Sequence, residues 1–246
     1  MKPIGIIGGT GLTRLANIQI TGHETLETPF GTPSAPLVRG RIAGREVLFL
    51  ARHGDPHRIP PHKVNYRANI WALREAGVER IVAVAAVGGI IEGMDDGRVA
   101  IPDQIIDYTY GRSQTFFEED LEEVVHIDFT DPYTPALRSL LIEGARELEL
   151  GAAEHATYAA TQGPRLETAA EVDRLERDGC HIVGMTGMPE AALARELGLE
   201  YGALAVVANR AAGRAPGEIT MEQIEATLVA GMERVARLLE WALPRL

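Results

Sequence analysis

The sequence contains a single cysteine, Cys180, among its 246 residues. One cysteine can form no disulfide within the chain, which is compatible with a reducing cytoplasm. Cys180 follows Gly179 and opens an apolar run, so we expect a buried core thiol rather than a nucleophile.

Basic side chains are scarce relative to acidic ones. The chain has 24 Lys and Arg against 35 Asp and Glu, which gives a formal net charge of −11. This balance disfavours nucleic acid as the main partner, because a phosphate backbone requires a positively charged surface. A small anionic substrate stays compatible with it, because a few local cations can form an anion site inside an acidic protein.

Long apolar runs are missing as well. No stretch approaches the length of a transmembrane span, and residues 1–9 lack the long apolar region of a signal peptide. We therefore expect no membrane association and a cytoplasmic location. Hydrophobic residues still make up 46% of the chain, enough for a sizeable core, and the length suits one large domain over residues 1–246.

Hydrophobic periodicity predicts strands and helices that alternate without a linker or repeat. We expect strands at 4–7, 81–86, 157–161, 181–186 and 204–208, a hairpin at 37–50, helices at 61–76, 137–148 and 167–178, and further helices beginning near 189 and 220. Thr220 and Gln223 form a capping-box pattern at the last of these, and 116–133 is expected to be a long acidic loop. The order predicts an α/β fold with a mixed central β-sheet flanked by helices, in which ligands bind beyond the carboxyl ends of strands.

A glycine-rich phrase, Gly8-Gly9-Thr10-Gly11, follows the first predicted strand. Its backbone N–H groups could approach a phosphate closely, with the Thr10 hydroxyl as a further donor. A simple turn after a strand explains the phrase equally well. The dinucleotide fingerprint would require glycine where Arg14 stands, and the Lys-Ser/Thr of a nucleotide P-loop is absent.

Arg52 and His53 come directly after another predicted strand. Arginine can bind phosphate through two parallel hydrogen bonds, and a place at a strand end favours a site over a surface role. The spacing of His53, Asp55 and His57 also resembles a metal cluster of a hydrolase. No second His/Asp-rich motif completes a coordination sphere, so we favour the loop interpretation and expect no metal.

Five phrases together carry a family resemblance: Gly8-Gly-Thr-Gly-Leu12, Ala51-Arg-His-Gly54, Lys63-Val-Asn-Tyr66, Gly163-Pro-Arg-Leu-Glu-Thr168 and Met185-Thr-Gly-Met-Pro-Glu190. In this order and spacing, the chain resembles the trimeric purine nucleoside phosphorylase and methylthioadenosine phosphorylase family over essentially its whole length. The resemblance implies a nucleoside phosphorylase-like fold, a homotrimer, and inorganic phosphate as co-substrate without another cofactor.

The resemblance also implies roles for individual residues. The phosphate ligands would be Thr10, Arg52, His53, the backbone of Ala86, and Thr186. Met185 would lie under the ribose, with His57 and Tyr66 nearby, and Leu166 would be a further substrate contact. Relatives often carry Thr or Asn where Ala85 stands, so one phosphate contact is expected to be missing. We interpret Glu190 as a first-turn carboxylate that favours the helix dipole.

Two residues, Glu167 and Asn209, would select the base. Adenine-specific relatives carry serine and aspartate there, whereas glutamate and asparagine resemble relatives that take 6-oxopurines. A 6-oxopurine donates its ring N–H to a carboxylate and accepts from an amide NH₂ at position 6. Adenine would leave the carboxylate unpaired, at a cost of roughly 1–3 kcal/mol or more. Asn209, Glu167 and His53 are therefore the expected catalytic residues.

The ribose 5′ end would meet an apolar wall. Relatives that cleave unmodified nucleosides place a histidine just before the last helix, where this chain has Met221 and Ile224. By family analogy, His126 would come from a neighbouring subunit. A methylthio group suits this wall, although both side chains could equally pack the helix alone.

These observations predict phosphorolysis of S-methyl-5′-thioinosine to hypoxanthine and 5-methylthioribose 1-phosphate. The alternatives are a general 6-oxopurine nucleoside phosphorylase and a methylthioadenosine phosphorylase. From other classes, a metal-dependent hydrolase would rest on His53, Asp55 and His57, and a non-catalytic nucleotide-binding module on the glycine phrase alone.

Overall fold

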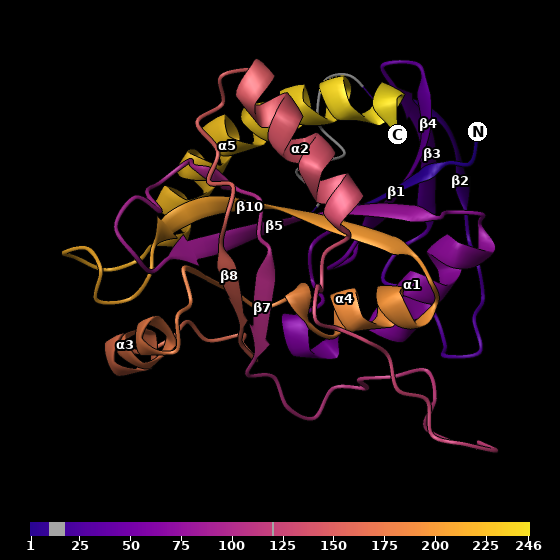
Figure 1. The fold of residues 1–246 in the computed structure, drawn as a ribbon, viewed down its shortest axis with the longest axis horizontal. Helices are drawn as coiled ribbons and strands as arrows, with labels where there is room; N and C mark the ends of the chain where they lie inside the picture. Colours follow the sequence, from indigo (N-terminus) through magenta and orange to yellow (C-terminus); the bar gives the residue numbers. More distant parts are fainter. Residues whose placement is uncertain (10–17, 120) are drawn as a thin grey trace.

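A mixed ten-stranded sheet forms the centre of the molecule. The computed structural model describes residues 1–9, 18–119 and 121–246 (Figure 1). Its strands are β1 (Ile4–Gly8), β2 (Gln19–Glu24), β3 (Leu37–Ile42), β4 (Arg45–Ala51), β5 (Arg80–Gly89), β6 (Val99–Ala100), β7 (Gln104–Asp107), β8 (Thr157–Ala160), β9 (Ile182–Gly184) and β10 (Glu200–Arg210). They run in the order β2-β3-β4-β1-β5-β9-β8-β7, and β10 pairs with β5 and β6. The mixed sheet and its α/β class confirm the expectation from the sequence.

Helices cover both faces of this sheet. They are α1 (Tyr66–Glu75), α2 (Pro135–Glu147), α3 (Ala169–Arg177), α4 (Gly187–Glu196) and α5 (Met221–Ala242), with 3₁₀ turns at Pro61–Lys63 and Leu243–Arg245. In Figure 1, α2 and α5 lie on one side of the sheet and α1 and α4 on the other. None of the helices in the described ranges has the length and apolarity that a membrane crossing requires.

Side chains that alternate in direction along the central strands form one hydrophobic core on each face of the sheet. Ile7 and Ile81 pack with residues of α1 and α4, whereas Ile6 and Val82 pack with residues of α2 and α5. Successive strand side chains point to opposite faces, so strands buried on both faces are apolar throughout. A third cluster joins α3 to the sheet and includes Cys180, which is 1% exposed, as expected for a core thiol. Burial raises the pKa of the Cys180 thiol.

Helix ends differ in detail from the sequence expectations. The helix expected at 61–76 begins as a 3₁₀ turn, and α1 starts only after Asn65, whose side chain accepts from the Ala68 N–H at 3.1 Å. Thr220 caps α5 by accepting from the Gln223 N–H, as half of a capping box requires. The full reciprocal box belongs to α3, between Thr168 and Glu171.

Two further features bear on the site. Residues 108–134, apart from residue 120, which is not described, connect β7 to α2 without helix or strand, as expected for the acidic loop. Figure 1 shows this segment extending beyond the body of the molecule. The sequence did not predict β2, β6 or β7.

Candidate active site

The carboxyl ends of β1 and β4 bring two of the expected site segments together. The strands are parallel, with Gly8 opposite Ala51, and the Arg52 N–H donates to the Gly8 carbonyl at 2.9 Å. Gly8, the first residue of the glycine phrase, and Arg52 therefore lie side by side at the edge of the sheet. Thr10, the expected hydroxyl ligand in that phrase, lies outside the described residues.

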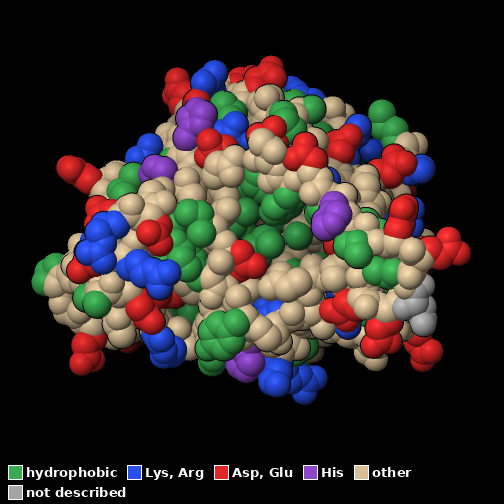
Figure 2. Space-filling model, turned by 60° about the horizontal axis from the view of Figure 1, so that its bottom comes forward, with side chains coloured by type: hydrophobic (Ala, Val, Ile, Leu, Met, Phe, Trp, Pro, Cys, Tyr) green, Lys and Arg blue, Asp and Glu red, His purple; other side chains and the backbone are tan. Residues whose placement is uncertain are grey.

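A gap opens in the sheet beside these strand ends. Along one edge of β5, β1 pairs with β5 residues up to Ala83, and β9 pairs with β5 residues from Gly88 onward. No strand of the described ranges pairs with the β5 residues between these two points on this edge. Ala86 lies in this interval and is exposed although β5 is a central strand. The face drawn in Figure 2 is hollowed near its centre, where hydrophobic side chains gather. An exposed alanine on a central strand marks space for a ligand against the backbone.

Arg52 reaches into this gap and is 2% exposed. Its Nη1 donates to the Val84 carbonyl at 3.0 Å, and its Nε and Nη2 donate to the two carboxylate oxygens of Glu190 at 2.7 and 2.8 Å. The Tyr201 hydroxyl donates to the same carboxylate at 2.9 Å. Burial opposes the charge on Arg52, but the facing carboxylate outweighs it and raises the pKa of the guanidinium.

This pairing corrects the interpretation of Glu190. The residue does lie in the first turn of α4, but it is 1% exposed and binds Arg52 from 138 positions away in the sequence. A buried carboxylate needs a partner of this kind. Helix-dipole stabilisation alone is therefore the wrong explanation, because the residue forms a buried ion pair under the expected phosphate site.

His53 is held in one tautomer. Its Nδ1 lies 2.8 Å from the Ile59 carbonyl, so Nδ1 carries the proton and Nε2 is left as an acceptor. Burial, and then the charge of Arg52, lower the pKa of His53 to about 4. The ring is therefore neutral near pH 7, and its Nε2 can accept a hydrogen bond from an O–H group of a ligand.

The His53, Asp55 and His57 phrase forms a stacked pair of rings. The His53 and His57 ring centroids lie 4.5 Å apart with the planes 6° from parallel. Asp55 and His57 are exposed. Within the described ranges, no group of three or more His, Cys, Asp or Glu residues could hold a metal ion.

Met185 and Thr186 lie between the end of β9 and the body of α4. Thr186 is the N-cap of α4 and is 7% exposed, yet its side chain makes no capping hydrogen bond. Met185 packs against Gly163, which has a φ of 60°, and a Cβ on Gly163 would meet the Met185 Sδ at 2.3 Å. Only glycine allows this approach without displacing the sulfur.

The two residues expected to select the base come from different elements, a loop before α3 and the end of β10. Glu167 lies just before the N-cap of α3, and its Oε1 accepts from the Thr161 hydroxyl at 2.7 Å. Asn209 follows a register shift in β10 and lies opposite Gly88. Its amide donates to the Arg210 carbonyl at 2.7 Å. Such a bulge turns a side chain away from the regular alternation of a strand.

Sequence reasoning missed three supporting residues. Thr161 orients Glu167, and Arg112 hydrogen-bonds to backbone carbonyls at Thr161, Gln162, Met185 and Met188. Arg214, after β10, donates to Asp173 at 2.8 Å and to Glu176 at 2.6 Å on α3. Single arginines and threonines in loops carry no sequence signal of such roles. The partners of Arg112 and Arg214 lie 38 or more positions away, and Thr161 and Glu167, although six positions apart, form no recurring sequence pattern.

The remaining expected contacts are distributed unevenly. Tyr66 is 3% exposed, and its hydroxyl donates to the Pro61 carbonyl at 3.0 Å. Leu166 is 45% exposed and Met221 is 67% exposed, Ile224 is half-buried, and His126 lies exposed in the 108–134 segment. The structure of one chain therefore does not gather the expected 5′ wall into a closed pocket. All of these substrate contacts stay predictions.

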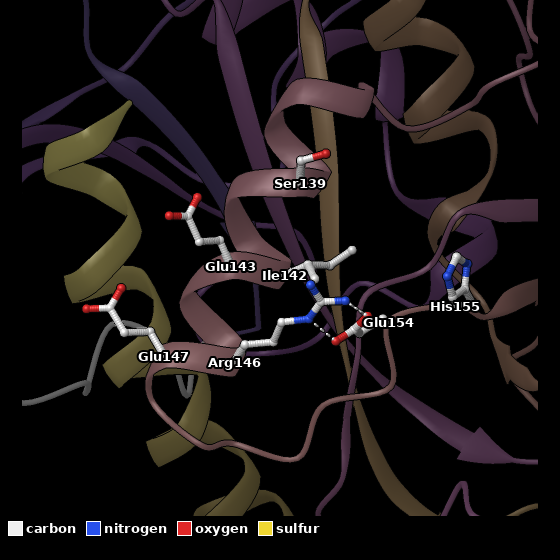
Figure 3. A pocket seen from close by; sticks show the side chains of 7 residues that line it. All are labelled: Ser139, Ile142, Glu143, Arg146, Glu147, Glu154 and His155. Carbon is white, nitrogen blue, oxygen red and sulfur yellow. Dashed lines mark hydrogen bonds and ion pairs between the residues drawn. The ribbon is translucent and has the colours of Figure 1, made fainter.

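A separate groove lies along α2. Its volume is about 500 Å³, and Figure 3 shows the side chains that line it: Ser139, Ile142, Glu143, Arg146, Glu147, Glu154 and His155. Two of these residues are paired, since Arg146 Nε donates to the Glu154 carboxylate at 2.6 Å. None of the expected site residues lines this groove, so it gives no support for a site there.

Comparison with known proteins identifies the family. Residues 3–244 match the family model described as the Phosphorylase superfamily. The chain is 57% identical over 235 residues, 96% of each chain, to a Pseudomonas syringae pv. tomato protein named "Probable S-methyl-5'-thioinosine phosphorylase". It is 45% identical over 249 residues, 99% of this chain and 93% of the relative, to the "6-oxopurine nucleoside phosphorylase" of Pyrococcus furiosus.

The fold agrees with these matches. A solved structure of methylthioadenosine phosphorylase from Schistosoma mansoni in complex with adenine resembles this chain with a TM-score of 0.94. The two are 30% identical, and the match covers 99% of this chain and 91% of that one. The resemblance seen in the five sequence phrases is therefore confirmed. The chain belongs to the phosphorylase superfamily, as one of its nucleoside phosphorylases.

Proposed function

We propose that this protein cleaves S-methyl-5′-thioinosine with phosphate, producing hypoxanthine and 5-methylthioribose 1-phosphate. The observation that carries the base assignment is the Glu167 carboxylate, which the Thr161 hydroxyl orients at 2.7 Å, together with Asn209 on the bulged end of β10. The carboxylate would accept the ring N–H of a 6-oxopurine. The Asn209 amide would donate to the departing base. The relatives named above support this assignment.

Phosphate would bind at the gap in the sheet, through Thr10, Arg52, His53, the Ala86 backbone and Thr186. Because Glu190 balances the Arg52 charge, neutral donors supply much of the anion's stabilisation, as they can in a water-poor site. A phosphate O–H would donate to the free Nε2 of His53. The Thr186 hydroxyl, which makes no cap bond, would donate to a phosphate oxygen.

The reaction would proceed without a covalent intermediate on the protein. A phosphate oxygen attacks the anomeric carbon as the glycosidic bond breaks, and the bonding electrons leave with the base. The proton that hydrogen phosphate carried ends on the base, which gives neutral hypoxanthine. The protein would hold the two reactants in line and stabilise charge as it develops on the base and the ribose. We propose inorganic phosphate as co-substrate and no metal or other cofactor.

We also propose a homotrimer in the cytoplasm, with the chain acting as one domain. Met221 is 67% exposed and His126 is exposed in the same chain. A neighbouring copy that brought its 108–134 segment over the ribose site would cover apolar surface that the single chain leaves open. His126 would then reach the 5′ end from the neighbour.

A general 6-oxopurine nucleoside phosphorylase is the second candidate. The exposure of Met221 favours it, because an uncovered wall would select weakly for a methylthio group. The Pyrococcus furiosus relative carries that name. Methylthioadenosine phosphorylase is disfavoured by Glu167 and Asn209.

A substrate panel tests the proposal. Inosine, adenosine and their 5′-methylthio forms are incubated with and without phosphate, and with EDTA. We expect phosphate-dependent, EDTA-resistant cleavage that is fastest for methylthioinosine. The double variant Glu167→Ser, Asn209→Asp should shift preference toward the 6-amino form. Faster cleavage of methylthioadenosine by the unmodified protein would contradict the base assignment, and zinc-restored activity after EDTA would contradict the phosphorylase mechanism.

A further inference from the structure

Arg112 joins the two loops that carry the proposed substrate contacts. Its Nη1 donates to the Met185 carbonyl at 2.8 Å and the Met188 carbonyl at 2.6 Å. Its Nη2 donates to the Thr161 carbonyl at 3.2 Å and the Gln162 carbonyl at 2.9 Å. One guanidinium therefore bridges the end of β8 and the start of α4.

The same side chain is fixed on its remaining sides. The Arg112 Nε donates to the Gln162 Oε1 at 3.2 Å, and Nη1 also lies 3.2 Å from the Tyr66 hydroxyl. The guanidinium carbon lies 5.4 Å from the centre of the Tyr66 ring. Donors spread in one plane can satisfy several carbonyls at once, which a lysine ammonium cannot do with the same geometry.

Each bridged loop leads directly to a proposed contact. The carbonyls of Met185 and Met188 flank Thr186, whose hydroxyl is the proposed phosphate donor. Thr161, on the other loop, orients the Glu167 carboxylate through its hydroxyl. The loops also touch where Gly163 lies against the Met185 sulfur. The bonds of Arg112 thus set the distance between the base-binding side and the phosphate side of the site.

We propose that Arg112 is a positioning residue for phosphorolysis. It acts through the Met185 and Thr161 loops without touching either substrate, and it holds nucleoside and phosphate in line for attack. The inference rests on the proposed function, because it takes these loops as the substrate-binding ones. A change at Arg112 should therefore lower the rate of the bound complex more than the affinity for either substrate.

Two matched lysine variants test this role. Arg112→Lys retains the positive charge but loses the planar set of N–H donors that reaches several carbonyls at once. Arg138→Lys is the control, since Arg138 on α2 also donates to two backbone carbonyls, of Pro102 and Glu154, outside the site. Both variants are assayed where unfolding curves show them fully folded, with kcat and each KM measured separately.

We expect Arg112→Lys to lower kcat by about tenfold or more, with smaller changes in the two KM values. Arg138→Lys should keep the kcat of the unmodified protein. Arg112→Ala should regain part of its kcat when guanidinium is added at concentrations that leave the protein folded, whereas added ammonium should not restore it. If Arg112→Ala fails to fold, the comparison of kcat between Arg112→Lys and Arg138→Lys tests the proposal by itself. An unchanged kcat in Arg112→Lys would overturn the proposal.

A readout without substrate separates this proposal from the function it rests on. Amide hydrogen exchange is measured in segments 159–168 and 183–190 of both lysine variants. We expect both segments to exchange faster together in Arg112→Lys and neither to change in Arg138→Lys. Unchanged exchange in both segments would overturn the bridging role whatever the substrate. A lack of phosphorolysis in the unmodified protein, with the exchange effect present, would contradict only the proposed function.

Discussion

Arg52 and Glu190 face each other through two parallel hydrogen bonds, with both side chains removed from solvent. A two-point contact fixes the plane of the guanidinium and the direction of its remaining donors. The pair thus connects the residue that follows strand β4 to helix α4, next to the gap in the sheet.

Removing one partner of this pair should destabilise the protein strongly. We expect Glu190→Gln to lower the free energy of unfolding by about 3 kcal/mol or more, because Arg52 would keep a buried charge without its counterion. Glu79→Gln, which breaks the exposed pair with Lys2, is the control and should leave stability unchanged. Urea unfolding measures both variants. Equal midpoints for the two would show that the buried pair contributes little.

Acid stability should depend on His53. The folded protein lowers the pKa of His53 from 6.5 to about 4, so the unfolded chain binds a proton there at higher pH than the folded one. Stability should fall as the pH drops through this window, by up to about 3 kcal/mol from this residue. His53→Gln should lose less stability between about pH 7 and pH 5, and the exposed His23→Gln should follow the unmodified protein. If all three proteins lost the same stability between these pH values, the lowered pKa of His53 in the folded protein would be contradicted.

Thr161 should matter for base recognition through Glu167. We expect Thr161→Val to lower kcat/KM for 6-oxopurine nucleosides by about tenfold, because the carboxylate loses a charge-assisted hydrogen bond that orients it. Thr28→Val removes a loop hydroxyl that donates to the Gly31 carbonyl and serves as the control. Steady-state kinetics with inosine and methylthioinosine measure the effect. If Thr161→Val and Thr28→Val had the same kcat/KM, Thr161 would have no role in recognition of the base.

Gly163 should tolerate no side chain without a change at Met185. Gly163→Ala and Gly179→Ala both place alanine at positive φ, but only the first would bring a Cβ against the Met185 sulfur. Both variants should lose about 1 kcal/mol of stability from the backbone. Only Gly163→Ala should also raise the KM for nucleoside. Nucleoside KM values that stay the same in the two variants would place Met185 away from the ribose.

The 5′ substituent should be small and apolar. Burying a few tens of Å² of a methylthio group against Met221 and Ile224 favours it by roughly 1 kcal/mol, and a hydroxyl there would lose water without gaining a partner. Methylthioinosine should therefore exceed inosine in kcat/KM by at least about tenfold. At saturating phosphate, Met221→His should reduce the ratio of the two kcat/KM values, because the histidine offers the 5′-hydroxyl a hydrogen-bond partner. Equal kcat/KM values for the unmodified protein would favour the general 6-oxopurine enzyme.

The central part of the fold could be predicted because its strands are buried on both faces. Ile4–Gly8 and the part of β5 that follows Arg80 are apolar without interruption, and such runs have few alternatives to an interior strand. The edge strands β2 and β7 lack this pattern, since their residues are exposed or half-buried. An edge strand can be held by backbone hydrogen bonds to one neighbour without burying apolar side chains. Hydrophobic periodicity therefore could not predict it.

Sequence reasoning could name candidate site residues where they follow predicted strands, but not where a residue acts through a partner. Arg52 and Asn209 became candidates because the carboxyl ends of strands meet at one edge of a sheet. Glu190 was misread, because a carboxylate in a first helical turn is ordinary and its partner is 138 positions away. Arg112 and Thr161 had no signal either, since the carbonyls that Arg112 binds lie far along the chain and the Thr161–Glu167 hydrogen bond follows no recurring sequence pattern.

The contact of Arg214 with Asp173 and Glu176 limits how such sequences can be recombined. It ties α3, which follows Glu167, to the segment that follows Asn209. A hybrid that took α3 from one parent and that segment from another would combine donors and acceptors that had not evolved together. Base preference should therefore be inherited as a block spanning roughly residues 167–217 and should not transfer with either half alone.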